Sequence, residues 1–387
     1  MHGISDAQRR SRLVRRHLLA PSVRAASAES VTDSVVALHA TDAATVFLSV
    51  CARLSEASVG AVERALYEDV SLVRLRSMRN TLFTVSRGLA PYVDASNART
   101  VAAKERRTFL KHLRDDGNGL DAHWLAETEK ETLAALTARG SATGSELSAA
   151  VPALRMKITV FPGKKQETVQ GVVTRVIRVL AADGLIRRDR PRGSWTSSQF
   201  RWTAAEPWPA REPAAARAEL ALRWLRSYGP ATEADLKWWT GWGLGQVRQA
   251  LEVAGAEEVR LDSGATGWVS PGDTEPEPTL EPWAALLPAL DPSAMGWADR
   301  GFHLPVEYRA ALFDRAGNIG PTVWWNGRIV GGWAQRADGE LVWRLLTDVG
   351  REATTAIEAE ASRLSGWVGE TRITPRFRTP LERELTV

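Results

Sequence analysis

The chain has 387 residues, of which 44% are hydrophobic and 25% are charged, and these values are typical of folded globular proteins and exclude global disorder. The formal net charge of +4 is a mild excess, and the length predicts two to four folded units rather than one. The single cysteine, Cys51, excludes an internal disulfide, and no run reaches the roughly 18 apolar residues of a membrane helix.

Basic residues are concentrated near the N-terminus. Six arginines fall between positions 9 and 24 with no acidic residue among them, whereas residues 257–299 hold nine acidic residues. This asymmetry predicts a protein that turns one face toward phosphates. Because no apolar segment of a secretory signal follows the arginines, we expect a cytoplasmic, nucleoid-associated protein.

Residues 1–115 are predicted to form a winged helix. The first helix is expected over residues 5–19, with apolar residues on one face and Arg9, Arg12 and Arg16 on the opposite face. Further helices are expected over residues 29–38, from about residue 42, and over residues 57–67. A β-hairpin is predicted after them, from the alternating runs at 72–76 and 81–85.

The same order of elements recurs twice. In residues 116–210 the helices are expected over 121–139, from 141, and over 168–182. In the last of these helices, Val169 is expected to point inward while Arg175 and Arg178 point outward, and two strands joined by a basic turn follow. Residues 211–270 are expected to hold three more helices and a hairpin. We therefore predict an α+β fold with three winged-helix units.

The remaining chain is predicted to be different in character. Residues 271–282 are expected to be a stiff, acidic, proline-rich linker. Residues 283–387 are predicted to form a mostly antiparallel, β-barrel-like module with one helix, because Asn-Gly and Asp-Gly pairs separate its alternating runs. A last strand is expected around residues 372–377.

Several segments then resemble one known family. They are Leu38-His-Ala-Thr, Met78-Arg-Asn-Thr-Leu-Phe, Tyr228-Gly-Pro-Ala-Thr-Glu-Ala-Asp-Leu-Lys-Trp-Trp-Thr-Gly and Val330-Gly-Gly-Trp. With the order of elements, they resemble, over essentially the whole chain, the winged-helix DNA-binding family of the azinomycin-resistance DNA glycosylase (AlkZ) and the YcaQ-type crosslink glycosylases. The resemblance implies a C-shaped protein around duplex DNA that removes bulky or crosslinked alkylpurines.

The resemblance also points to a catalytic segment. In that family a Gln-x-Gln or Gln-x-Asp pair follows the second helix of the first unit, where this chain has His39-Ala40-Thr41 and then Asp42. Hydrolysis of an alkylpurine passes through an oxocarbenium-like sugar, so the protein must hold a water near the anomeric carbon. We predict that His39 positions this water, that Thr41 adds a hydrogen bond, and that Asp42 orients His39 or stabilises the cation. Alternatively, Thr41 and Asp42 cap the next helix and His39 packs at a helix junction.

Eight arginines are predicted to bind DNA. They are Arg9, Arg12, Arg16, Arg79, Arg175, Arg178, Arg188 and Arg192. The first three form either a phosphate-contacting row or a solvated helix face. Arg175 and Arg178 lie on a helix of the kind that faces the major groove, and Arg188 and Arg192 lie on the predicted wing. Arg79 comes from the family-like segment Met78–Phe83.

Three functions follow as alternatives. The first is a monofunctional DNA glycosylase without a cofactor, the second is a non-catalytic DNA-binding regulator or protecting factor, and the third is a drug-sequestering protein that uses a cleft and its tryptophans. The histidines have no metal-like spacing, so no metal is expected. Double-stranded DNA is the predicted partner, and Trp238, Trp239 and Trp242 are predicted to be core rather than base-stacking residues.

Overall fold

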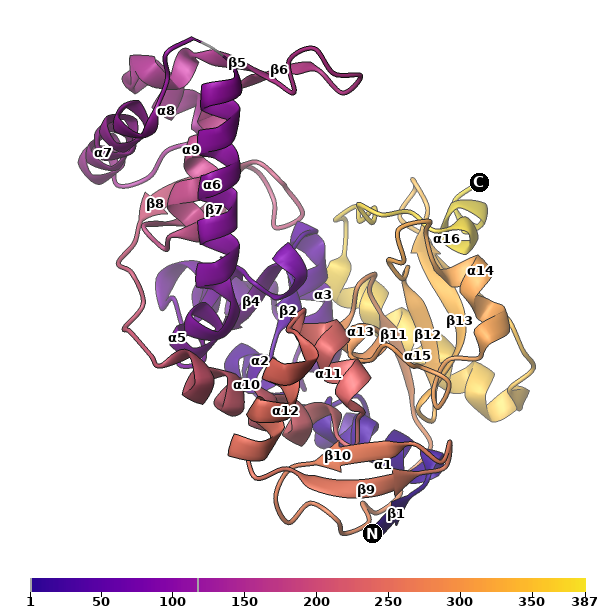
Figure 1. The fold of residues 1–387 in the computed structure, drawn as a ribbon. Coiled ribbons are helices and arrows are strands. Elements are labelled where there is room, and N and C mark those ends of the chain that lie inside the picture. The colour runs from indigo at the N-terminus through magenta and orange to yellow at the C-terminus, as the bar shows by residue number, and fades with distance from the viewer. Residues whose placement is uncertain (1, 117) are drawn as a thin grey trace.

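The computed structural model describes residues 2–116 and 118–387 and has the mixed α and β composition expected from the sequence (Figure 1). Strands β2, β4 and β3 form an antiparallel sheet in that order near its centre. The elements of this N-terminal region are β1 (His2–Ile4), α1 (Asp6–Arg16), α2 (Ala28–Ser34), β2 (Leu38–His39), α3 (Ala43–Arg53), α4 (Val59–Glu63), β3 (Leu72–Arg76), β4 (Leu82–Ser86) and α5 (Ala90–Val93).

Local capping fixes where the helices around this sheet begin. The Ser27 hydroxyl accepts the backbone N–H of Ser30 at the start of α2, and the Asp42 carboxylate accepts that of Ala44 at the start of α3. Helix α3 is mostly apolar and is buried along its whole length, as expected for a helix inside the core, and its buried Arg53 pairs with Asp291. Strand β2 is therefore held between two capped helices.

Residues 99–204 form a separate lobe, here called the upper lobe, with a hydrophobic cluster of its own (Figure 1). Its long helix α6 rises from the centre of the molecule, and its two hairpins are β5–β6 and β7–β8. The elements are α6 (Arg99–Asp116), α7 (Ala122–Arg139), α8 (Gly144–Ala150), β5 (Lys157–Val160), β6 (Thr168–Gly171), α9 (Val172–Ala182), β7 (Ile186–Pro191) and β8 (Phe200–Ala204).

Three helices and a hairpin follow, as predicted for residues 211–270. They are α10 (Pro213–Tyr228), α11 (Glu233–Thr240), α12 (Leu244–Val253), β9 (Glu257–Leu261) and β10 (Thr266–Val269). Thr232 and Asp235 form a reciprocal capping box at the start of α11. The N-terminal strand β1 pairs in parallel with β9, so the start of the chain lies beside the hairpin of residues 257–269.

The C-terminal module contains a four-stranded antiparallel sheet in the order β11-β12-β13-β14. Helix α15 packs against this sheet. The elements are β11 (Ala284–Leu287), α13 (Pro292–Met295), α14 (Arg309–Leu312), β12 (Thr322–Trp325), β13 (Arg328–Gln335), β14 (Leu341–Leu345), α15 (Gly350–Val368) and α16 (Pro380–Leu385). In the described chain the pairing leaves β11 and β14 as edges of an open sheet.

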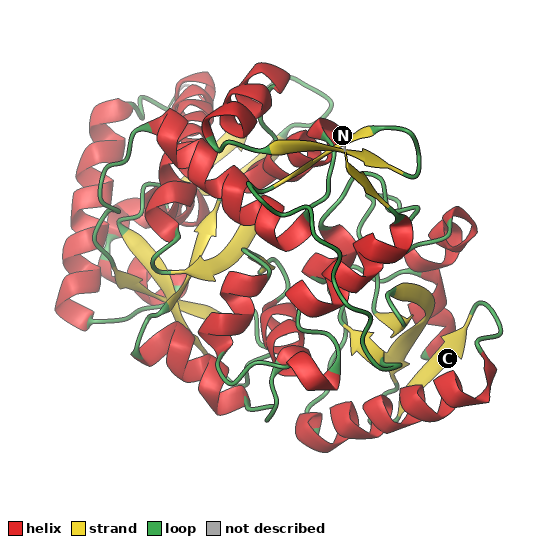
Figure 2. Cartoon of the chain, turned by 90° about the horizontal axis from the view of Figure 1, so that it is seen from below, coloured by secondary structure: helices red, strands yellow, loops and turns green. Residues whose placement is uncertain are grey.

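Hydrophobic contacts connect these parts. One cluster joins α1, β3, β4, α5 and α10 to the C-terminal module, and a second joins α2 and α3 to α15. The β7–β8 loop places Trp195 in the second cluster. The centre of its ring lies 5.2 Å from that of Phe47 and 6.1 Å from that of Trp367. Seen from below in Figure 2, the strands lie in several separate groups among the helices. The β7–β8 loop thus attaches the upper lobe to both α3 and α15.

The structure corrects the sequence analysis at four places. Residues 168–171 are strand β6 rather than helix, so Val169 is 63% exposed where it was expected to point inward. Residues 372–377 form no strand in the described chain, and helix α16 follows them instead. Helix α6 and strand β5 were not predicted.

Within the described residues, no helix has both the length and the apolar character needed to cross a membrane.

Candidate active site

Strand β2 places His39 at the wall of a large cavity. The strand pairs with β4, with His39 opposite Phe83, and the N–H of Ala40 donates to Leu82 O at 2.9 Å. Leu38 and Ala40 are buried in the cluster that contains α3. Because side chains alternate along a strand, His39 points to the other side, where its ring meets Phe83 edge-on with the ring centres 5.2 Å apart.

The cavity has a volume of about 670 Å³, within the range of pockets that hold ligands. Its lining comes from β2, the β3–β4 turn, the upper lobe, α11 and the C-terminal module. The residues are His39, Thr41, Arg76, Arg79, Asn80, Thr81, Leu82, Arg178, Arg188, Trp238, Met295, Arg300, Arg309, Ala316, Gly317, Asn318, Arg376 and Phe377. Two of the three predicted catalytic residues, His39 and Thr41, therefore share one cavity.

Burial keeps His39 neutral. The side chain is 8% exposed, and burial, followed by the positive charge of Arg79, lowers the pKa of His39 to about 4. Its Nδ1 atom is buried and has no hydrogen-bond partner in residues 2–116 and 118–387. Packing on Phe83, rather than a carboxylate, consequently orients the ring, and at neutral pH the imidazole has a lone pair that can accept a hydrogen bond.

Asp42 lies outside this cavity. Its Oδ1 accepts the N–H of Ala44 at 3.1 Å, and its Oδ2 accepts the N–H of Arg376 at 2.9 Å. The carbonyl of Thr41 accepts a further hydrogen bond from Arg376 Nη1 at 3.3 Å. The structure thus corrects the prediction that Asp42 orients His39. The carboxylate caps α3 and fixes the C-terminal segment beside the catalytic segment.

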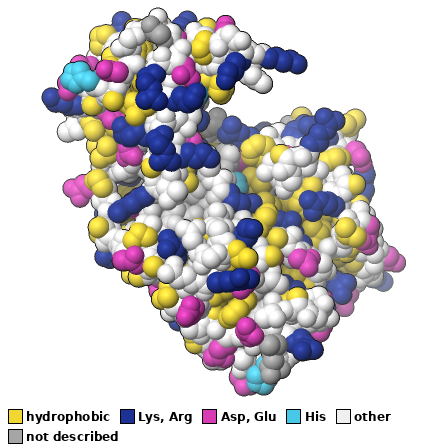
Figure 3. Space-filling model, in the orientation of Figure 1, with side chains coloured by type: hydrophobic (Ala, Val, Ile, Leu, Met, Phe, Trp, Pro, Cys, Tyr) yellow, Lys and Arg dark blue, Asp and Glu magenta, His cyan; other side chains and the backbone are white. Residues whose placement is uncertain are grey.

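Arginines dominate the charge of the cavity. In the described chain, no aspartate or glutamate lines it, and seven arginines do. One of these has a carboxylate within ion-pair distance, since Arg178 lies 3.7 Å from Glu105. Figure 3 shows Lys and Arg side chains on both sides of the hollow between the upper lobe and the C-terminal module. Such a site attracts anions and concentrates them in a partly enclosed space.

Burial strengthens this preference for anions. It lowers the pKa of Arg188 to about 10, with Arg74 and Arg76 adding to the effect, and it lowers the pKa of Arg300 to about 10, with Arg309 and Arg79 adding to it. Each of these guanidinium groups is therefore partly desolvated. Among the described residues neither has a carboxylate within ion-pair distance, although the more distant Asp235 and Asp299 oppose the lowering of the Arg300 pKa. A bound phosphate would supply the missing charge.

The β3–β4 turn shapes the edge of the cavity. Arg79 and Asn80 both have left-handed backbone conformations, with φ values of 52° and 56°, which asparagine tolerates better than most residues. The Arg79 guanidinium lies 4.0 Å from the ring centre of Trp238, and Arg300 covers the same ring at 4.9 Å. Trp239 and Trp242 are buried as predicted, whereas Trp238 is half-buried and lines the cavity.

The row of arginines on α1 is not at the cavity. Arg12 is 1% exposed and donates to Asp273 Oδ1 at 2.9 Å and to Glu275 O at 2.7 Å. Arg16 pairs with the same aspartate at 2.8 Å, and Arg9 is buried. We correct the expected phosphate-contacting row accordingly. Arg12 and Arg16 hold the acidic segment against α1, and Arg9 pairs with Asp6 and lies over the Phe302 ring.

The other predicted DNA-binding arginines divide into two groups. Arg79, Arg178 and Arg188 line the cavity, whereas Arg175 contacts His112 Nδ1 at 2.8 Å and Arg192 pairs with Glu146 at 2.5 Å. Sequence reasoning missed Arg76, Arg300, Arg309 and Arg376. The alternation in Arg74-Leu75-Arg76 was the available signal for Arg76, because it places both arginines on one face of β3. The other three come from loops and a short helix with no local signal.

Comparisons with known proteins give a family and a similar fold for this chain. Residues 32–367 match a family described as "DNA glycosylase AlkZ-like". The fold is similar to the solved structure of the Streptomyces sahachiroi DNA glycosylase AlkZ, with a TM-score of 0.72 and 23% sequence identity over 97% of this chain and 100% of that one. Among curated proteins, none matches the chain by sequence.

Proposed function

This chain belongs to the AlkZ-like DNA glycosylase family, and we propose that it hydrolyses the N-glycosidic bond of alkylated or crosslinked purines in double-stranded DNA. The observation that carries the proposal is the position of His39 and Thr41, the residues at the family's catalytic segment, inside an arginine-lined cavity of about 670 Å³. The reaction class requires a water acceptor beside a site that binds phosphates. The neutral imidazole of His39 supports the first requirement and the seven arginines of the lining support the second.

DNA binding in this proposal begins with the phosphates. Arg79, Arg178 and Arg188 contact the backbone around the damaged nucleotide, and Arg76 and Arg376 extend the same surface. Three winged-helix units, at residues 1–115, 116–210 and 211–270, surround the duplex together with the C-terminal module. Arg175 and Arg192 lie outside the cavity and contribute, in this proposal, to the outer contacts with the duplex.

The chemistry then needs little acid–base assistance. Alkylation at N7 gives the purine a positive charge, so the bond between C1′ and N9 breaks with its electron pair moving to the purine, which leaves as a neutral base. Water adds to the cationic sugar at C1′ and loses a proton. His39 accepts that proton, and Thr41 orients the water. A weakly basic imidazole suffices because the leaving group is already activated.

The absence of a carboxylate among the lining residues of the described chain gives the arginines a second role. Their charge would disfavour a cationic sugar unless phosphates neutralise it. In this proposal the phosphates of the bound strand do so, and the cavity is matched to the transition state only when DNA occupies it. Among the lining residues of the described chain, His39 is the nitrogen base that is neutral at neutral pH, because the arginines around it are protonated.

The test uses duplex DNA with a single N7-alkylguanine, and abasic sites are scored by alkaline cleavage. We expect His39→Ala to slow base release by about 100-fold or more, the range of a general base, with DNA affinity unchanged. His123→Ala, on the exposed face of α7, is the matched control and should release base at the wild-type rate. Salt-sensitive binding without base release, on this lesion and on bulkier N7 adducts, would favour the non-catalytic DNA-binding alternative.

A further inference from the structure

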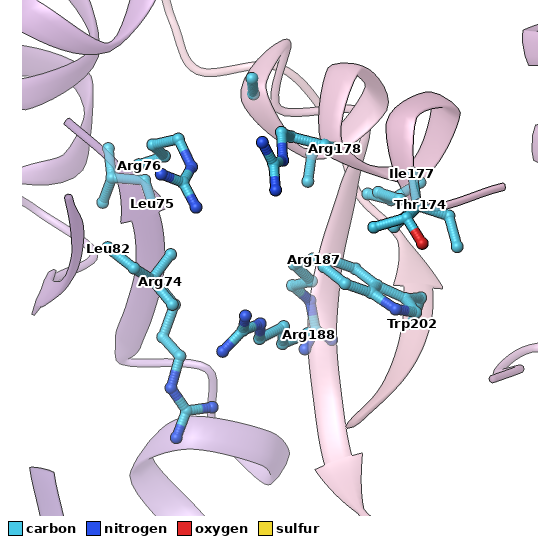
Figure 4. Close-up of a pocket in the computed structure, with 13 residues that line it drawn as sticks. Arg74, Leu75, Arg76, Leu82, Thr174, Ile177, Arg178, Arg187, Arg188 and Trp202 are labelled. Atoms are coloured by element: carbon cyan, nitrogen blue, oxygen red, sulfur yellow. The ribbon is translucent and has the colours of Figure 1, made fainter. Parts of the chain in front are cut away.

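A second, smaller cavity lies beside the first, between the central sheet and the upper lobe (Figure 4). We call it the arginine slot. It has a volume of about 160 Å³ and adjoins the catalytic cavity, because Arg76, Leu82, Arg178 and Arg188 line both. Its other lining residues are Arg74, Leu75, Thr174, Ile177, Ala181, Ala182, Ile186, Arg187 and Trp202.

Five arginines line the slot from two sides. Arg74 and Arg76 come from β3, and Arg178, Arg187 and Arg188 come from α9 and β7 of the upper lobe (Figure 4). In the described chain no acidic residue lines the slot, and the single carboxylate within ion-pair distance of these five is Glu105, 3.7 Å from Arg178. The slot therefore brings together like charges from two parts of the molecule.

The neighbouring groups leave much of this charge uncompensated. The Arg74 guanidinium donates to the Tyr67 hydroxyl at 3.2 Å, and Arg76 donates to Asn80 O at 2.7 Å. Arg187 Nη1 is buried and has no hydrogen-bond partner in residues 2–116 and 118–387. The described partners of these arginines are thus neutral acceptors, and one buried N–H donor has no partner. This pattern is expected of an arginine cluster whose negative charge is supplied by a bound ligand.

The electrostatics agree with the geometry. Burial lowers the pKa of Arg188, and the charges of Arg74 and Arg76 on the opposite wall lower it further. Burial likewise lowers the pKa of Arg76, with Arg178 across the slot adding to the effect and Glu105 opposing it. An anion between the walls would turn each of these repulsions into an attraction.

We infer that the arginine slot binds adjacent phosphate groups and, when filled, ties the upper lobe to the central sheet. Guanidinium forks match phosphate oxygens in geometry as well as charge, which favours phosphate over a carboxylate. The slot is far too narrow for a double helix, so its ligand is a single strand or a free diphosphate. The apolar side of the slot, with Ile177 and Trp202, suits the sugar and base of a nucleotide.

This inference deepens the proposed function and rests on it for the identity of the strand. Because the slot and the catalytic cavity share four residues, phosphates in the slot would belong to nucleotides next to the one beside His39. Filling the slot would then fix the register of the damaged strand and close the upper lobe in one step.

The experiment measures pyrophosphate binding to the full-length protein by calorimetry, at ionic strength held constant with sodium chloride. We expect the slot to be the tightest pyrophosphate site, and we expect Arg74→Gln and Arg187→Gln each to weaken binding at that site at least tenfold while any weaker binding in the larger cavity is unchanged. Both residues line the slot but not the catalytic cavity. Arg223→Gln on α10, which removes an arginine paired with Glu219, is the charge-matched control and should bind like the wild type.

A second measurement separates the two sources of phosphate. Competition by a short oligothymidylate would identify a nucleic-acid strand as the ligand, whereas binding of pyrophosphate without competition would identify a free diphosphate. Equal loss of binding in Arg223→Gln, or none in Arg74→Gln and Arg187→Gln, would overturn the inference. Base release by the wild type is scored independently, so failure of the slot and failure of the proposed glycosylase activity are distinguishable.

Discussion

The arginines of α1 and those of the cavity beside His39 have opposite surroundings. Arg12 and Arg16 meet Asp273 and backbone carbonyl groups within 3.3 Å, whereas Arg76 and Arg188 face a cavity with no carboxylate among its described lining residues. The basic N-terminal stretch and the acidic segment near residue 273 are far apart in the sequence, yet they are each other's partners in the fold. Charge clustering along a chain consequently says less about ligands than the presence or absence of a nearby counter-ion.

The largest expected effect comes from breaking the α1 contacts. Arg12→Ala removes one of the two arginines on Asp273 and the buried donor to the carbonyl of Glu275, so we expect the free energy of unfolding to fall by about 2 kcal/mol. Arg309→Ala, in the cavity and without a carboxylate within ion-pair distance in the described chain, should change it by no more than about 0.5 kcal/mol. Chemical denaturation of both variants measures the difference. Equal losses would show that the two sets of arginines are not distinct in their structural role.

The next effect concerns DNA affinity. Arg76→Gln and Arg79→Gln should each weaken binding to duplex DNA about tenfold, as expected when a charge-assisted contact to a phosphate is lost. The slope of log affinity against log salt should decrease by about one for each arginine removed. Arg16→Gln is the control from α1, since its partners are Asp273 and Glu277, and it should change neither quantity.

Much of the fold was predictable because local signals and packing agree. The helix that begins after Asp42, the β3–β4 hairpin and the three helices of residues 213–253 all follow from caps and periodicity, and the structure confirms them. The errors fall where local pattern and pairing compete. Residues 168–171 continue the apolar pattern of α9 but pair with β5, and the helix of residues 99–116 has too few apolar residues for periodicity to reveal it.

The candidate site was less predictable, since it depends on contacts between distant segments. His39 and Thr41 came from the family resemblance, and both line the cavity. Asp42 has the capping role that the sequence analysis gave as the alternative. Arg376 is the clearest example of a cavity residue that the sequence alone does not reveal. It comes from an irregular segment more than 300 residues later. Its place beside Thr41 follows from two hydrogen bonds, one from its backbone N–H to the Asp42 carboxylate and one from its guanidinium to the Thr41 carbonyl, that no local pattern encodes.

The smallest expected effect connects the cavity arginines to His39 through pH. His39 must be neutral to accept a proton, so base release should be constant near neutral pH and fall as pH drops through the folded-state pKa of about 4. Burial is the larger cause of that lowered pKa and Arg79 the smaller, so Arg79→Gln should raise it and move the acid limb of the pH profile upward by less than one unit. The contribution of His39 to folding stability changes with pH in the same direction. Because its pKa in the folded protein is below the ordinary value of 6.5, the unfolded chain binds more protons. The free energy of unfolding therefore falls as pH drops from 6.5 toward 4. Rates at saturating DNA, corrected for spontaneous acid depurination, measure the shift, with Arg79→Lys as the control that keeps the charge. An acid limb that stays in place in Arg79→Gln would mean that the cavity arginines act on the bound strand alone.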